Sequence, residues 1–502
     1  MRDRCSHMGI WLASLSKSRR ECCWQKMRRI SFREAIPMRK NSLHTALLIA
    51  SICIYCGGQI WQCISWPPFY SFDETLEVDY VYQITQGHLP SFFAGPQFNP
   101  LHLQYPYDVQ WRYQHPPLFY LIQAPAFMLF DTVHHPIQGI WAMRGMETML
   151  GICVIFASSW AARRIIGRAN IVTALVPLIV ASNRCFPSVV FNYTLASLWT
   201  IFLIGMAASL IRTRPQDFTT KQLLAWVIIV MLAPLTRTST IPIMCLCGLM
   251  VITHLIVSHC KILRTWLVAV VIPLLLSIAG SAWFYIRLHK LSGSFTGSQP
   301  EWSSKHLGRN THLSLWQALT DRRFYLSSMS QYQNSSVTAT AAGWVFVMIL
   351  TVIPLLWGMA MMIMKNVNNC LSKAPEDIEI RVMLTLGLIG TVFQQLLFYK
   401  QGGSANAVYC SLISIIFAVF IARGFSVFTR LWAVPMILWL TARCMAFGVE
   451  VRLRWPFAHD GTAYGSSWPW ELATYLGIAL VTGATIYTAV VCARACSSQI
   501  VA

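Results

Sequence analysis

Apolar segments of about twenty residues alternate with short polar segments along most of this chain. The first begins at Leu43 and the last ends near Cys492. A helix of that length crosses a hydrocarbon layer about 30 Å thick. The pattern therefore predicts an all-α, polytopic integral membrane protein with about twelve transmembrane helices, roughly eleven to thirteen. We expect them near residues 43–66, 145–162, 170–190, 193–211, 222–236, 240–258, 265–286, 341–364, 381–399, 405–422, 428–447 and 471–493.

The composition supports this class. Of the 502 residues, 55% are hydrophobic and 12% are charged, whereas about a quarter of the residues in a soluble protein are charged. The net charge is +20, and residues 1–42 hold eleven Lys and Arg. Short basic segments beside a membrane span stay in the cytosol, so we predict a basic cytosolic arm rather than a nucleic-acid-binding arm or a cleavable signal. The expected contacts are with membrane lipids and not with nucleic acid.

The charges between the apolar segments predict the topology. Residues 66–115 contain a single arginine and five carboxylates, so they are placed outside: Asp73, Glu74, Glu77, Asp79 and Asp108. The later basic clusters are placed inside. An odd number of crossings is then needed between the acidic segment and the basic cluster that starts at Arg163, but two apolar segments lie there, 116–133 and 145–162. The first is short and contains prolines, so it is predicted as an interfacial or re-entrant outer helix. This assignment leaves Arg144 outside.

The chain is expected to have three parts. They are the basic arm (1–42), a transmembrane core (43–425) with outer loops 66–144 and 287–340, and C-terminal transmembrane helices (426–502).

The acidic outer segment has the pattern of a helix. Ser71 and Glu74 fit a capping box, and Gly87 is suited to end a helix over residues 72–86. Asp73, Glu77 and Tyr80 then share one face. Glu74 could serve only as a cap, and Asp73 could be only a first-turn carboxylate favoured by the helix dipole. What distinguishes Asp73 is the sequence Gln114-His115-Pro116-Pro117, which closes the same loop, and Arg144 shortly after it.

Several segments together resemble a known family. SFDETLEVDYVYQITQGHLP followed by YQHPPLFYLI is similar to the first outer loop of GT-C membrane glycosyltransferases, in particular the protein O-mannosyltransferase and aminoarabinose transferase group. RGMETMLGICVIFASSWAARRIIG, MLAPLTRTST, WFYIRLHKLSGSFTG and KQGGSANAVYCSLIS resemble later segments of that group in the same order. The resemblance covers roughly residues 45–420 and implies a GT-C-like core.

The resemblance implies a reaction. Such enzymes move a sugar from a polyprenyl-phosphate carrier to an acceptor, which can be a glycan, a lipid or a protein, on the outer face of the membrane. By the family match Asp73 is the general base, and Arg144 and Arg237 bind the carrier phosphate. A hydroxyl acceptor requires a base, and a phosphate leaving group requires cations on the same side. Arg287 is a weaker candidate, because arginines at span ends often only anchor the helix.

Other positions carry alternatives. Glu74 is included among the substrate-binding candidates. His115 is either a phosphate donor or a polar residue before two prolines. Asn192 stands where relatives carry a carboxylate; it can hydrogen-bond a sugar but cannot act as a base. Gln114 replaces an acidic residue that could bind a divalent ion, which makes metal dependence doubtful.

The outer loop that starts at Arg287 contains Trp302 and Trp316 and is suited either to acceptor recognition or to simple solvation. We expect the protein to lie in a bacterial plasma membrane.

Two other functions stay open at this stage. A transporter or flippase would have a similar number of spans but is expected to carry charged groups within them. The predicted spans are nearly free of such groups, with His254 as an exception, and show no clear inverted repeat. The departures at Gln114 and Asn192 keep open a family member that binds lipid carriers without catalysis.

Overall fold

The computed structural model describes residues 40–66, 68–69, 72–100, 108–183, 189–329, 348–369, 375–459 and 468–501. Every regular element among these residues is a helix. The prediction of an all-α fold is therefore confirmed for the part of the chain that the structure describes. The basic arm up to residue 39 and the predicted N-cap Ser71 lie outside these residues.

Within the described residues, nine helical segments are long and apolar enough to cross a membrane. They contain the helices α2 (Lys40–Ser65), α5 (Pro136–Ile166), α7 (Tyr193–Ile211), α9 (Ile241–Val257), α11 (Ile272–Ser292), α18 (Pro375–Lys400), α19 (Ser414–Phe425), α20 (Ala433–His459) and α21 (Trp468–Val501). α11 continues α10 (Leu263–Trp266) through a single π-helical stretch, Leu267–Val271.

Shorter apolar helices account for the other predicted segments. α6 (Ile171–Asn183), α8 (Thr220–Leu232) and α17 (Ile353–Asn369) occupy three regions that the sequence predicts to cross. α4 (Leu118–Leu129) has 12 residues and contains Pro125, and at 1.5 Å per residue it is about 18 Å long. The assignment of this segment as an interfacial or re-entrant helix stays a prediction. The total of about twelve spans stays a prediction.

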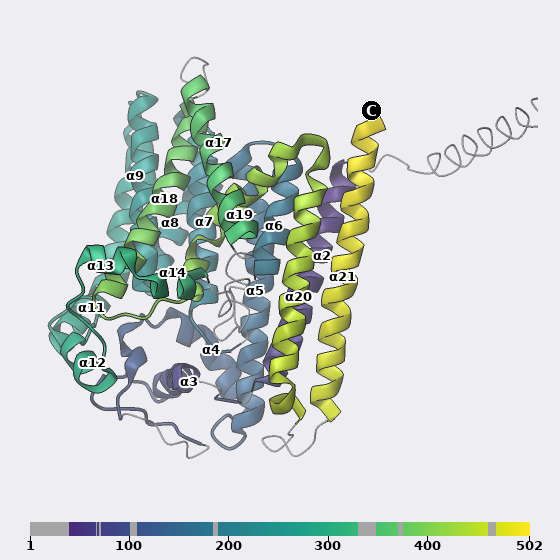
Figure 1. Ribbon diagram of the computed structural model, residues 1–502. Helices are drawn as coiled ribbons and strands as arrows, with labels where there is room; N and C mark the ends of the chain where they lie inside the picture. Colours follow the sequence, from purple (N-terminus) through teal and green to yellow (C-terminus); the bar gives the residue numbers. More distant parts are fainter. Residues whose placement is uncertain are drawn as a thin grey trace, which may run out of the picture.

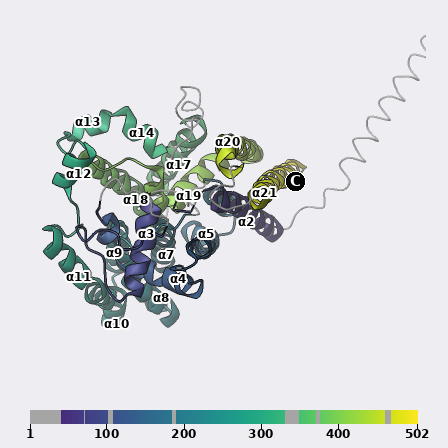
Figure 2. The same ribbon diagram turned by 90° about the horizontal axis from the view of Figure 1, so that it is seen from below.

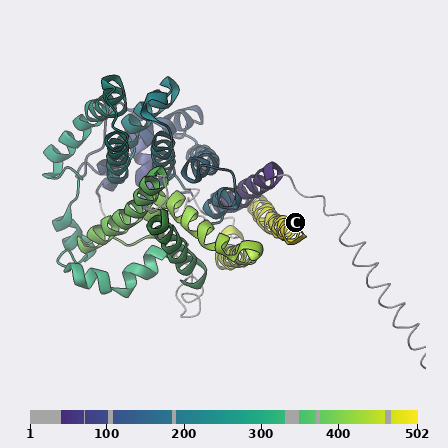
Figure 3. The same ribbon diagram turned by 90° about the horizontal axis from the view of Figure 1, so that it is seen from above.

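The long helices run side by side as a bundle, and α3 (Phe72–Thr85) lies across one end of it (Figures 1 and 2). α2, α20 and α21 form one side of the bundle, where purple α2 lies beside yellow α21 (Figure 3). Glycines permit this contact, because a Cβ atom on Gly477 would lie 2.7 Å from the carbonyl oxygen of Gly57. The short helix α12 (Pro300–Leu307) lies near the same end as α3 (Figure 1), and α13 (Leu315–Thr320) and α14 (Arg322–Met329) follow it.

The end of α3 agrees with the sequence. Gly87 has a φ of +85°, the left-handed conformation that glycine adopts without strain. The amide of His88 then donates to the carbonyl of Gln83 at 3.1 Å, which completes the helix end. Gly87 ends the helix as predicted.

One expectation about the spans is wrong. Glu147 lies in α5 with no exposed surface and accepts a hydrogen bond from Gln123 at 3.2 Å. His254, the exception that the sequence indicated, has its Nδ1 atom 2.9 Å from Glu379 of α18, which precedes the predicted span 381–399. The apolar residues around Glu147 concealed it, because a membrane helix tolerates a buried carboxyl group when a polar partner on another helix faces it.

Candidate active site

The acidic helix α3 is mostly enclosed by the elements around it. Glu74, Glu77 and Asp79 have no exposed surface, whereas the side chain of Asp73 is 51% exposed. A buried carboxylate requires a partner, because burial removes its hydration. The partners of these four residues therefore determine how the helix is held.

Glu74 pairs with Arg144 across the boundary between α3 and α5. The Nε and Nη2 atoms of Arg144 donate to the two carboxylate oxygens at 2.9 and 2.6 Å. Its Nη1 atom donates to the carbonyls of Cys63 and Trp66 at 2.8 and 2.7 Å. The amide of Val190 adds a 3.0 Å hydrogen bond to Glu74. Both charged side chains are fully buried. Through these hydrogen bonds the pair joins α3 to α5, to the end of α2 and to the residues just before α7.

Asp79 holds the loop that follows α3. It accepts hydrogen bonds from the amides of Gln97 and Phe98 at 2.6 and 2.8 Å, and from the side chain of Gln110. Burial raises the pKa of Asp79, while these hydrogen bonds act in the opposite direction. Gln110 also caps the 3₁₀ helix η1 (Trp111–Gln114) by accepting from the amide of Arg112 at 2.9 Å. Asp79 thereby sets the position of η1.

Arg112, the first buried residue of η1, faces two carboxylates of α3. Its Nη2 atom pairs with Asp73, and its Nε atom lies 3.3 Å from Glu77 without hydrogen-bond alignment. Burial lowers the pKa of Arg112, but Asp73 and Glu77 raise it more, and the net pKa lies above the ordinary value. Tyr80 donates to the carbonyl of His115, the residue that follows η1, at 2.8 Å. Asp73, Glu77 and Tyr80 thus all face the same segment, and they share one face of α3 as predicted.

Arg237 lies opposite Arg112, just before the 3₁₀ turn η4 (Thr238–Thr240). Its guanidinium donates to Asn192 and to the hydroxyl of Tyr193, and it lies 3.6 Å from the centre of the Tyr193 ring. His115 lies between the two arginines, with its Nε2 atom 3.3 Å from Arg237 and 3.5 Å from Arg112. Because burial and these two cations lower the pKa of His115 well below its ordinary value, the imidazole is neutral.

These residues line a cavity of about 240 Å³. Its charged walls are Asp73, Arg112, Arg237 and Arg309. Trp111 lies beside Arg309, whose guanidinium carbon is 5.5 Å from the Trp111 ring centre. Uncharged side chains complete the walls, among them Gln114, His115, Tyr193, Thr238, Ser239, Thr296, Gln394, Gln395, Phe398, Ser404, Tyr409 and Leu412. The cavity thus combines a partly exposed carboxylate with three guanidinium groups.

The structure divides the predicted site residues into two groups. Asp73, His115 and Arg237 line the cavity. Asn192 does not line it, but its side-chain oxygen accepts a hydrogen bond from Arg237. Glu74 and Arg144 bind each other instead, so neither faces the cavity. Arg287 donates to the carbonyls of Leu89 and Pro90 at 3.2 and 2.8 Å and holds the loop after α3.

The sequence interpretation did not identify two arginines that line the cavity, Arg112 and Arg309. Arg112 is the single arginine in an acidic segment, and that isolation was the signal that could have identified it. Arg309 carried no such signal, because it belongs to a polar loop that also contains other basic residues.

Comparison with known proteins gives structural matches only. No family model matches the sequence, and no curated protein matches it. ArnT from Cupriavidus metallidurans bound to undecaprenyl phosphate is similar at 14% identity and a TM-score of 0.46, over 88% of this chain and 77% of that chain. The archaeal oligosaccharyltransferase AglB from Archaeoglobus fulgidus, in complex with an inhibitory peptide and a dolichol-phosphate, is similar at 11% identity and a TM-score of 0.47. That match covers 91% of this chain and 56% of AglB, so the chain spans little more than half of its length.

Both TM-scores are below 0.5 and both identities are below 15%, so these matches assign neither a family nor a function to this chain.

The cavity is poorly suited to a resident divalent metal ion. Among the described residues, no group of three His, Cys, Asp or Glu side chains lies together. The one carboxylate in the cavity wall is paired with Arg112, and Gln114 is neutral. A hard cation prefers several carboxylate oxygens, and this donor set does not provide them.

Replacing Glu74 with Gln should destabilise the protein strongly, because Arg144 would keep its buried charge without a carboxylate. We expect a loss of about 3 kcal/mol or more in the free energy of unfolding, measured as thermal unfolding in detergent. Asp108→Asn, which changes an exposed carboxylate in the loop after α3, is the control and should alter stability by less than about 1 kcal/mol. Equal melting temperatures for Glu74→Gln and the parent would contradict the structural role of the pair.

Glu77 should make stability depend on pH. Burial raises its pKa from 4.5 to about 7, while Arg112 opposes the shift. Between these two values the folded protein holds a proton that the unfolded chain releases, so stability falls as pH rises from about 4.5 to about 7. Glu77→Gln should remove this loss, which amounts to up to about 3 kcal/mol. The measurement is the melting temperature of parent and variant at pH 5 and pH 8.

In the Glu77 experiment, the exposed Glu301→Gln variant is the control and should follow the parent at both pH values. A difference between parent and Glu77→Gln that does not change with pH would show that Glu77 is not the group that titrates.

Proposed function

We propose that this protein is a glycosyltransferase that moves a sugar from a polyprenyl-phosphate carrier to an acceptor on the outer face of the membrane. The observation that supports this most directly is the cavity in which Asp73 faces Arg112, Arg237 and Arg309. The proposed location is a bacterial plasma membrane with the N-terminus in the cytosol. The similarity to the outer loop of GT-C enzymes supports the same reaction.

In this proposal the arginines bind the carrier phosphate. Three guanidinium groups and one carboxylate give the cavity walls a formal charge of +2, with His115 neutral. A sugar linked through a phosphodiester carries one negative charge, and the phosphate that leaves gains a second. Cations already in position favour the more highly charged product, and therefore the transition state that leads to it.

Asp73 is the proposed general base. An oxygen of the acceptor forms a bond to the anomeric carbon while the bond from that carbon to the phosphate oxygen breaks. The acceptor proton passes to the Asp73 carboxylate, and the electron pair of the broken bond stays on the phosphate. Asp73 suits this role because it is half exposed at the cavity, whereas the other carboxylates of α3 are buried.

The proposed role of His115 is to position the arginines. Its neutral imidazole accepts from Arg237 and Arg112 and keeps the two cations apart without adding a third charge. Asn192 and Tyr193 hold Arg237 from the other side. A guanidinium whose direction is already set loses little freedom when it binds phosphate.

The acceptor is proposed to approach past Trp111. Trp111 lies in the cavity wall, and its ring centre is 5.4 Å from that of Trp302 in the outer loop. Arg309 comes from the same loop. Trp316 is 71% exposed and does not line the cavity. Loop 287–340 is therefore proposed to contact the acceptor through Trp302 and Arg309.

Asp73→Asn should lower the rate of sugar transfer about 100-fold or more, because the amide cannot accept the acceptor proton. The assay follows transfer from a defined polyprenyl-phosphate sugar in liposomes, with kcat and KM for the donor measured separately. The KM for the donor should change little, since Asp73 is not proposed to bind the carrier.

The matched control for Asp73 is Asp108→Asn, another exposed carboxylate of the outer loop, which should keep full activity. Full-rate transfer by a folded Asp73→Asn variant would overturn the assigned mechanism. Passage of a solute across the liposome with no consumption of sugar donor would favour the transporter.

Arg237→Gln should raise the KM for the lipid-linked donor about tenfold or more and also lower kcat, because a cation is lost from both the bound donor and the leaving phosphate. Lys290→Gln, which removes an exposed cation at the end of α11, should leave both constants unchanged. An unchanged donor KM in Arg237→Gln would remove Arg237 from the proposed phosphate site.

A further inference from the structure

A second and larger cavity, of about 380 Å³, lies at the opposite end of α5. Its wall includes Ile165 and Gly167, whereas Arg144 is near the end of α5 that meets α3. At 1.5 Å per residue, the helix between Arg144 and Ile165 is about 30 Å long. The two cavities are therefore separate, and the charge pattern of the loops predicts the second at the cytosolic face.

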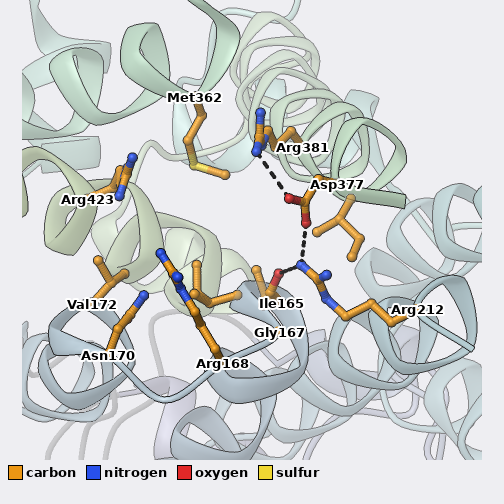
Figure 4. Close-up of a pocket in the computed structure, with 12 residues that line it drawn as sticks. Ile165, Gly167, Arg168, Asn170, Val172, Arg212, Met362, Asp377, Arg381 and Arg423 are labelled. Carbon is orange, nitrogen blue, oxygen red and sulfur yellow. Dashed lines mark hydrogen bonds and ion pairs between the residues drawn. The ribbon is translucent and has the colours of Figure 1, made fainter. Parts of the chain in front are cut away.

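Four arginines from different elements surround this cavity (Figure 4). Arg168 follows α5, Arg212 ends α7, Arg381 belongs to α18 and Arg423 belongs to α19. Asp377 is the one carboxylate in the wall. The formal charge of the wall is four minus one, or +3.

The single carboxylate is already shared by two of the arginines. Asp377 lies 2.8 Å from Arg212 and 3.5 Å from Arg381. Arg212 also donates to the carbonyls of Arg164 and Ile165 at 2.7 and 2.6 Å, at the end of α5. Arg212 is therefore held by the fold and is not free to reorganise around a ligand.

A glycine makes the position of Arg212 possible. Gly167 has a φ of +77°, and a Cβ atom there would lie 2.8 Å from the guanidinium carbon of Arg212. Both the backbone conformation and the space exclude a side chain. The cationic wall is thus built into the end of α5.

The other side of the cavity has cations with no such partner. Within the described residues, the side chains of Arg168 and Arg423 form no hydrogen bond or ion pair. Both extend toward the open centre of the cavity in Figure 4. Arginines that converge on an open space and are not paired with a carboxylate are suited to an anion, and guanidinium geometry matches the oxygens of phosphate.

Apart from Asn170, the remaining wall is apolar. Val172, Ile380 and Met362 line the cavity beside the arginines. The wall is formed where α5, α7 and α19 end and α18 begins, at an end of the apolar segments of the bundle. An apolar wall next to cations at this level matches the region where a phospholipid head group meets its chains.

We propose that this cavity binds a phosphate group, carried either by an anionic phospholipid or by a free phosphate ion. The proposal does not depend on the glycosyltransferase function, because no residue is shared between the two cavities.

The test is a binding measurement on the full-length protein in detergent. The double variant Arg168→Gln/Arg423→Gln removes the two cations that have no partner. The matched control is Arg163→Gln/Arg264→Gln, which removes two exposed arginines predicted at the same face but outside the cavity wall. Native mass spectrometry measures the binding of short-chain phosphatidic acid, and calorimetry measures inorganic phosphate.

We expect the cavity double variant to bind one of these probes about tenfold or more weakly than the parent and the control. Loss of phosphatidic acid binding alone identifies a lipid head group as the occupant, and loss of both identifies the phosphate group itself. Equal binding by parent and cavity variant, or an equal loss in the control, overturns the proposal. If the double variant does not fold, the single change at exposed Arg168 provides the same comparison.

Discussion

The buried pair between Glu74 and Arg144 is the interaction on which the site beside α3 depends. It joins α3 to α5 and, through carbonyls near the end of α2 and the amide of Val190, to two more parts of the bundle. Both charges have left water, so neither can be removed without exposing the other to an apolar surrounding. α3 also contacts the short helix α4, where the rings of Tyr80 and Tyr120 stack, but the Glu74–Arg144 pair connects it to the long helices of the bundle.

From this fixed helix, the remaining carboxylates take different roles according to burial. Asp79 holds backbone amides of the following loop and, through Gln110, sets the start of η1. That start carries Arg112 back toward Asp73 and Glu77. Only Asp73 keeps substantial contact with solvent. The order of exposure along α3 therefore separates the groups that support the site from the group that faces the cavity.

These two cavities use arginine under different conditions. At the end of the bundle beside α3, Asp73 and the guanidinium groups line the same space, an arrangement suited to moving a proton and stabilising a phosphate. At the other end, Asp377 is shared by Arg212 and Arg381, while Arg168 and Arg423 face an open centre. The second arrangement has no carboxylate left to act as a base, so it is suited to binding alone.

The sequence by itself determined the features that depend on local spacing. Apolar length predicted the all-α membrane fold, and helical period placed Asp73, Glu77 and Tyr80 on one face, while Gly87 ended the helix as expected. It also selected Asp73, His115 and Arg237, which the fold brings to one cavity.

Only the tertiary structure decided that Arg144 pairs with Glu74, that Arg112 and Arg309 line the cavity, and that Glu147 is buried in a span. Spacing within one helix follows from a fixed rise and turn, whereas pairing between residues far apart in the chain depends on how the whole bundle packs.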